Sequence, residues 1–182
     1  QFQTGRFSLR HELFRIKRES YLQTANATAA EIKDANRRWR QTLAGYRVDD
    51  LWEVSEFRRH CRPFMSKYNG KQPGLVIPMP TSIIAGENFF GKRAGPGDNV
   101  FNPTAYATKI NSLGVWFEDY DPTAMVATPY VYLIPTGNDV MYIPTSNELD
   151  VRTWRVEDQI IPVPFAIGDT ELADPDWIPV RD

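Results

Sequence analysis

The sequence has few of the residues on which most catalytic and metal sites depend. Its single cysteine, Cys61, excludes an internal disulfide and a zinc site built from several thiolates. Its two histidines, His11 and His60, lie far apart in the sequence, and the nucleophile motif G-x-S-x-G does not occur. No apolar run reaches the roughly 18 residues that a membrane-spanning helix needs. We therefore expect a protein that is not an enzyme and has no catalytic residues, cofactor or metal.

Charge is distributed unevenly along the chain. Residues 1–72 carry 15 Lys/Arg and 8 Asp/Glu, whereas residues 73–182 carry 6 Lys/Arg and 15 Asp/Glu. Such a sign change indicates two segments with different neighbours, so we expect a helical stem over 1–72 and a separate β domain over 73–182. The net charge of −2 does not favour nucleic-acid binding, which is typical of strongly basic domains.

Residues 8–44 contain neither glycine nor proline and follow a helical period. Ser8 is a suitable N-cap and Gly45 a suitable residue after the last turn, so the pattern predicts one helix of about 35 residues. A short second helix is expected from Leu51 to about Cys61, before Pro63.

Small and apolar side chains recur along the long predicted helix at alternating spacings of four and three. This heptad spacing is typical of a coiled coil and predicts an oligomer interface. The alternative is an amphipathic helix that packs on its own domain. The predicted interface consists of Tyr21, Ala25, Thr28, Ile32, Ala35 and Trp39.

The sequence pattern changes after Gln72, where short apolar runs alternate with turn residues. The runs LVIPM, INSLGVWF, YVYLIP, DVMYIP and RTWRV are typical of antiparallel strands. Together with the helices they predict an α+β chain that ends in a jelly-roll-like antiparallel β-sandwich. Alternation places Leu113, Val115 and Phe117 on its inner face. Trp116 and Tyr132 are then predicted to lie on an outer, partner-binding face.

The stretch GENFFGKR, residues 86–93, nearly matches the phosphate-binding motif G-x-x-x-x-G-K-[ST]. Arg93 stands where the motif needs a hydroxyl for magnesium, and the following AGPGD cannot begin a helix. We therefore expect no nucleotide at this loop. The carboxylates at 118–121 lack the D-x-D-x-D-G spacing of a calcium loop, which favours a solvated loop there.

Residues 101–117, FNPTAYATKINSLGVWF, resemble a strand in the C-terminal region of insecticidal Tc-toxin A subunits. The matching positions are Pro103, Tyr106, Lys109, Ile110, Ser112, Leu113 and Val115. SYLQTANATAAEI at 20–32 is similar to the end of the channel helix that precedes the β domain in that family. Asn102 and the loop FFGKRAGPGD depart from the family pattern.

The resemblance implies a pentameric, secreted translocation device. The helix would form part of its channel or stalk, and the β domain would dock a partner protein subunit. Two other functions stay open: a structural subunit of a virus-like or injection-type particle, and a carbohydrate-binding β-sandwich that presents Trp116, Tyr120, Tyr130 and Tyr132. The mass of the native assembly distinguishes the three.

Overall fold

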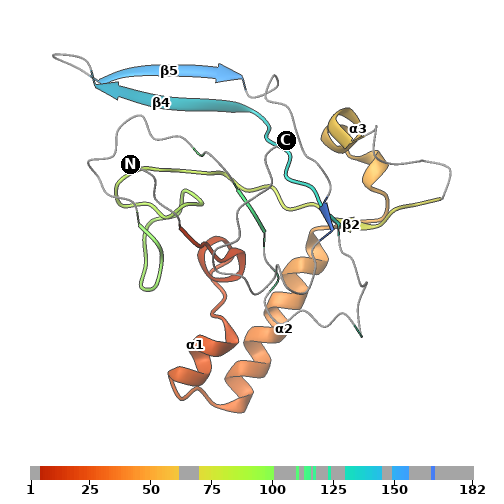
Figure 1. Cartoon of the computed structure of the whole chain (residues 1–182). Helices are drawn as coiled ribbons and strands as arrows, with labels where there is room; N and C mark the ends of the chain where they lie inside the picture. The colour runs from red at the N-terminus through yellow and green to blue at the C-terminus, as the bar shows by residue number, and fades with distance from the viewer. Residues whose placement is uncertain are drawn as a thin grey trace. The chain divides into compact units, whose positions relative to one another are not determined.

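A computed structural model describes residues 5–61, 70–100, 110, 113–115, 117, 123, 130–144, 149–155 and 165–166. The chain divides into two compact units, each made from two separate stretches. Unit 1 comprises Gln1–Leu51 and Lys71–Tyr106, and unit 2 comprises Trp52–Gly70 and Ala107–Asp182. Helices and small antiparallel sheets occur together, in agreement with the α+β class (Figure 1). The domain boundary predicted at residue 72 stays a prediction.

The segment expected as one long helix is divided into three helical pieces in unit 1. A π-helical turn, η1 (Leu9–Leu13), is followed by α1 (Glu19–Thr24) and α2 (Ala29–Gly45). Arg15 and Asn26, with φ of 57° and 53°, lie in the two breaks and adopt the left-handed conformation that ends a helix. Thr28 then starts α2 by a reciprocal capping box with Glu31. Helical periodicity alone did not reveal these breaks.

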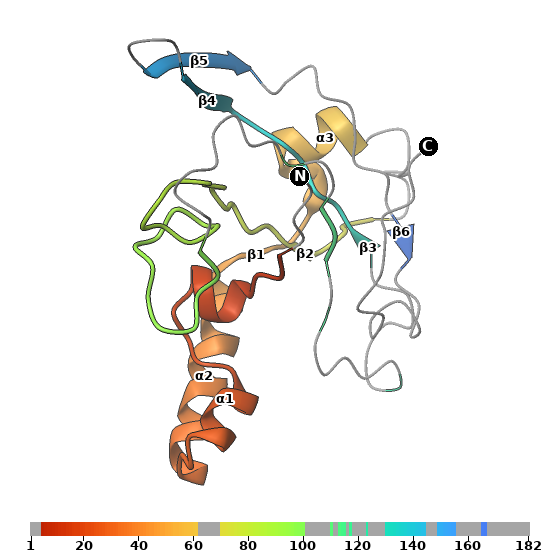
Figure 2. The same ribbon diagram turned by 60° about the vertical axis from the view of Figure 1, so that its left-hand side comes forward.

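The first two α-helices form a hairpin with a small apolar core. Both views show α1 beside the first half of α2 (Figures 1 and 2). Burial of the apolar side chains between them stabilises helices that are too short to persist alone. The core consists of Ile16, Leu22 and Ala35, with Phe14, Ala27, Ile32 and Trp39 packed around it.

A small antiparallel sheet with two residues in each of its two strands joins the end of this hairpin to residues 71–100. Strand β1 (Arg47–Val48) pairs antiparallel with β2 (Gly74–Leu75). A further backbone bond, from Leu51 N to Gln72 O at 2.7 Å, extends the contact. A Cβ atom at Gly74 would come within 2.7 Å of the Leu51 side chain, so only glycine fits there without a shift.

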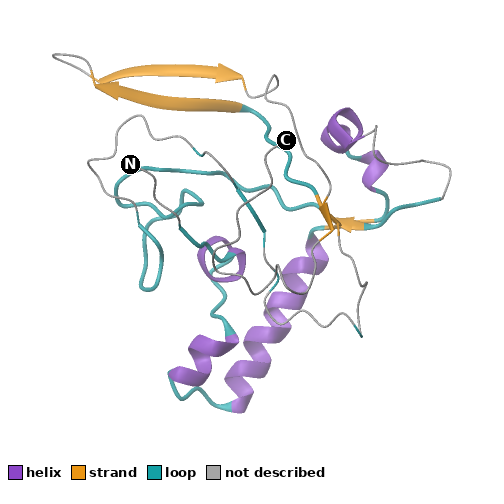
Figure 3. Cartoon of the chain, viewed as in Figure 1, coloured by secondary structure: helices purple, strands orange, loops and turns teal. Residues whose placement is uncertain are grey.

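Unit 2 contains the predicted second helix and the remaining strands. The predicted segment contains a 3₁₀ turn, η2 (Leu51–Glu53), followed by α3 (Ser55–Cys61), which confirms a helix there; residues 62–69 lie outside the described residues, so its predicted end stays a prediction. Strand β3 (Tyr130–Val131) pairs with β6 (Phe165–Ala166), and β4 (Asn138–Pro144) pairs with β5 (Leu149–Arg155). Figure 3 shows β4 and β5 as a two-stranded ribbon. The described strands pair only in twos, so the sandwich stays a prediction.

Candidate functional site

The loop over residues 86–98, which nearly matched a phosphate-binding motif, is organised around one asparagine. Asn88 is fully buried. Its side-chain Oδ1 accepts hydrogen bonds from the backbone N–H of Phe90 at 3.1 Å and of Lys92 at 3.0 Å. In a phosphate-binding loop such N–H groups face the ligand. Here the Asn88 side chain of the loop itself accepts hydrogen bonds from both N–H groups.

The same asparagine connects this loop to η1 and to a buried carboxylate. Its Nδ2 donates to the Glu12 carbonyl at 3.0 Å and to Asp98 at 3.2 Å. The Asp98 side chain has no exposed surface, and it accepts two bonds from Arg15, at 2.7 and 2.8 Å, and one from Gly95 N at 2.9 Å. Burial raises the pKa of Asp98, but Arg15 and these hydrogen bonds outweigh burial and hold the pKa below its ordinary value.

A second buried carboxylate fixes the other side of the loop. Glu12 accepts hydrogen bonds from Ser8 N at 2.5 Å and Asn99 N at 2.9 Å. Phe89 is buried, and its ring stacks on Phe7 at 4.3 Å between centroids. Hydrogen bonds within unit 1 thus satisfy the polar groups of this network. Such an arrangement is typical of a structural network that keeps a loop in place.

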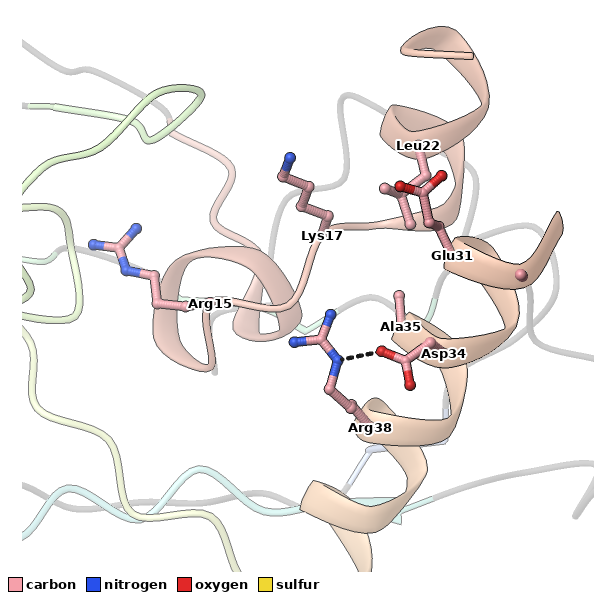
Figure 4. Close-up of a pocket in the computed structure, with 8 residues that line it drawn as sticks. Arg15, Lys17, Leu22, Glu31, Asp34, Ala35 and Arg38 are labelled. Carbon is pink, nitrogen blue, oxygen red and sulfur yellow. Dashed lines mark hydrogen bonds and ion pairs between the residues drawn. The ribbon is translucent and has the colours of Figure 1, made fainter. Parts of the chain in front are cut away.

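An open depression of about 610 Å³ lies beside the helical hairpin (Figure 4). Figure 4 shows Asp34 and Arg38 facing each other, while Arg15 is directed away from them. Hydrogen bonds from Arg37 and Arg38 hold the pKa of Asp34 below its ordinary value. The residues that line the depression are Arg15, Lys17, Leu22, Ala30, Glu31, Asp34, Ala35 and Arg38.

The other charged groups of the depression also have partners inside unit 1. The Glu31 carboxylate accepts from the backbone N–H and the hydroxyl of Thr28, at 2.8 and 2.7 Å. The backbone bond, followed by the hydroxyl bond, lowers the pKa of Glu31. Lys17 Nζ lies 5.4 Å from the centre of the Tyr21 ring. Because each of these charged groups already interacts with a group of unit 1, the depression carries no assignment to a ligand.

The six residues of the predicted oligomer interface do not share one face. Tyr21, Ala25 and Thr28 are exposed around the turn between α1 and α2. The other three members belong to the core of the hairpin or pack against it: Ile32, Ala35 and Trp39. For these three, the structure matches the alternative of an amphipathic helix on its own domain. The interface itself stays a prediction.

The structure describes only some of the residues predicted to form the inner and outer faces of unit 2, so the partner-binding face of Trp116 and Tyr132 stays a prediction. Leu113 and Phe117, expected inside, are 37% and 36% exposed, because no second sheet covers them in the part of the chain that is described. Tyr132, expected outside, is half-buried, and its ring meets Phe57 edge to face at 5.0 Å. Trp116 lies outside the described residues.

The β4–β5 ribbon is a surface that the sequence did not single out. Its seven cross-strand pairs run from Asn138 opposite Arg155 to Pro144 opposite Leu149. Val140 is 54% exposed and Val151 is 51% exposed. The runs DVMYIP and RTWRV predicted both strands, but a sandwich would have covered one face of each.

Comparison of the chain with protein-family models, with curated proteins and with solved structures finds no match. Within the described residues, no helix is both long and apolar enough to cross a bilayer. The same residues contain no cluster of three or more His, Cys, Asp or Glu side chains suited to a metal ion. The candidate surfaces for function are therefore argued from their own geometry.

Proposed function

We propose that the chain is a non-enzymatic assembly module that binds a partner protein through unit 2. The observation that carries this proposal is the β4–β5 ribbon with its exposed Val140 and Val151. A two-stranded ribbon is marginally stable in water unless a further strand or a packed surface supports it. Contact with a partner would supply that support and cover the exposed valines.

Other apolar side chains of unit 2 favour the same function. Ile110, Leu113 and Phe117 are each exposed by more than a third, and Tyr130 is 63% exposed. Each is a large side chain whose burial against a partner stabilises a complex by roughly 1.5–3 kcal/mol when complete. Such side chains are typical of a subunit observed without its partner.

The resemblance of residues 101–117 to Tc-toxin A subunits supports a toxin-translocation complex as the assembly. In this proposal the β domain, completed as a sandwich, docks a partner subunit, and the exposed Tyr21, Ala25 and Thr28 contribute to contacts between helices. The chain then acts outside the cell that makes it.

Multi-angle light scattering of the full chain, with hydrogen exchange of β4 and β5 across a dilution series, tests the proposal. We expect a mass above that of one chain and slow exchange in the ribbon that is lost on dilution. Five chains fit a toxin-like device, and a large shell fits a particle subunit. A monomer at every concentration, with exchange in the ribbon independent of concentration and of any added partner fraction, would overturn the assembly function.

A further inference from the structure

Strand β5 pairs with β4, and no second strand pairs with its opposite edge in the described part of unit 2. An edge of this kind is a template for a further strand. The β4 edge is less suitable because Pro144 has no N–H to donate. The edge of β5 contains no proline.

Two charges of opposite sign lie two positions apart on β5. The Asp150 side chain is 53% exposed, the Arg152 side chain is 68% exposed, and their closest charged atoms are 3.9 Å apart. Side chains two apart on a strand point to the same face. Charged residues on an edge usually oppose pairing with another strand. Here the alternating signs allow pairing with one particular strand, an antiparallel copy of β5.

Symmetry restricts how two copies of β5 can pair. A two-fold axis normal to the sheet keeps each side chain on its own face of the sheet. Residues directly opposite each other on paired strands must share a face. The axis must therefore lie between a residue and its own copy, not between two successive positions. An axis at Asp150 or at Arg152 places like charges opposite each other. An axis at Val151 places Asp150 opposite Arg152 of the partner subunit, and Arg152 opposite Asp150 of the partner subunit. Opposite charges directly across two strands stabilise the pair, and like charges destabilise it.

We propose that the β5 edge binds a second copy of this chain, antiparallel, about a two-fold axis through Val151. This proposal rests on the proposed assembly function, and it specifies which molecule binds at the edge of β5. A two-fold contact closes on two chains, whereas a five-membered ring needs a head-to-tail contact. The proposal therefore predicts a dimer, or an assembly built from such dimers.

Two variants that reverse one charge each test the register in which the two β5 strands pair. Asp150→Arg places arginine opposite arginine, and Arg152→Asp places aspartate opposite aspartate. Each variant alone should self-associate about tenfold more weakly or worse in sedimentation equilibrium, because two favourable pairs become two repulsive ones. An equimolar mixture should associate as tightly as the wild-type chain, since every Arg again faces an Asp. Recovery in the mixture also shows that both variants are folded.

A cross-link provides an independent check. In a Cys61→Ser background, Val151→Cys should form an intermolecular disulfide on mild oxidation, because the two Val151 positions face each other across the axis. Thr153→Cys is the matched control. The two Thr153 positions are offset by four residues, about 13 Å, which is beyond the roughly 7 Å reach of a disulfide.

The outcomes separate this proposal from the assembly function. If the wild-type chain associates but neither charge variant weakens it, or the mixture does not recover, the β5 contact is wrong and the assembly function stands. Equal cross-linking at 151 and 153 likewise rules out the register. If the wild-type chain is monomeric at every concentration, the β5 contact is wrong, and the exchange experiment above then decides whether the assembly function fails with it.

Discussion

An aspartate–arginine pair occurs in each unit, and the two pairs differ in how far they are exposed to solvent. In unit 1, the side chain of Asp98 has no exposed surface and Arg15 donates two hydrogen bonds to it, within a network that also includes Asn88. In unit 2, the side chains of Asp150 and Arg152 are both more than half exposed, and their closest charged atoms are 3.9 Å apart along one strand. A buried, hydrogen-bonded pair fixes a loop, whereas an exposed pair adds little to stability and is available to a partner.

Some apolar side chains of the two units also differ in exposure to solvent. Phe89 and Phe90 are buried where the loop of residues 86–98 packs in unit 1. Leu113, Val140 and Val151 of unit 2 are exposed. Unit 1 also exposes some large apolar side chains, such as Leu75 and Val100, so the two units differ in degree: among the described residues, unit 1 buries more of its apolar side chains than unit 2 does. The following experiments test this difference, in order of decreasing effect.

Truncation of one apolar side chain in each unit should give the largest contrast. Phe89→Ala removes a ring that is 4% exposed and stacked on Phe7, and should lower the free energy of unfolding by about 3–5 kcal/mol. Leu113→Ala, at an exposed position, should lower it by less than about 1 kcal/mol. Urea denaturation of both variants provides the measurement. Equal losses would show that Leu113 is covered as a core residue.

Removing the charge of the buried carboxylate should have a smaller, pH-dependent effect. Asp98→Asn should cost about 2 kcal/mol at pH 7, because charge-assisted bonds from Arg15 and Gly95 are weakened. The pKa of Asp98 is lowered in the folded state, so its stabilisation is complete above the ordinary pKa of about 3.9 and is lost as pH falls through the lower folded value.

Thermal denaturation from pH 7 to pH 2.5 measures this difference between Asp98→Asn and the wild-type chain. The difference should be constant above about pH 5 and should shrink in strong acid. Asp150→Asn is the control at an exposed position and should change stability by less than about 0.5 kcal/mol. A difference that grows as pH falls would contradict the buried ion pair.

Loss of a helix cap should give the smallest effect. Thr28→Ala removes the hydroxyl that accepts from Glu31 N and bonds the Glu31 carboxylate, and should cost about 1 kcal/mol. Thr153→Ala, on the exposed ribbon, should cost less than about 0.5 kcal/mol. Circular dichroism during denaturation follows both variants. If the two losses are equal, the capping box does not determine where α2 begins.

Local signals predicted part of this structure well. Ser8 caps η1 by accepting a hydrogen bond from His11 N, as an N-cap before a helical pattern should. The predicted second helix contains α3, the run DVMYIP lies in β4, and RTWR of the run RTWRV lies in β5. Each of these features depends on residues within a few positions of one another, so periodicity and capping are sufficient.

The predictions that depended on distant residues were less successful. The long helix is interrupted at Arg15, whose left-handed backbone is held by side-chain bonds to Asp98 and to the Arg93 carbonyl, about 80 positions away. Heptad spacing grouped Tyr21 with Ala35, although a turn at Asn26 separates them. A period counts positions along one helix and cannot detect a reversal of the chain.

Composition and local pattern alone determined that the chain is α+β, where its second helix lies, and which runs belong to the ribbon. Tertiary structure decided that the near-match to a phosphate-binding loop is a loop fixed by Asn88, Asp98 and Glu12. It also decided that Ile32, Ala35 and Trp39 pack inside the helical hairpin. The physical reason is that a hydrogen-bond partner or a covering side chain can lie anywhere in the sequence, and only folding brings it within about 3 Å for a hydrogen bond or about 4 Å for an apolar contact.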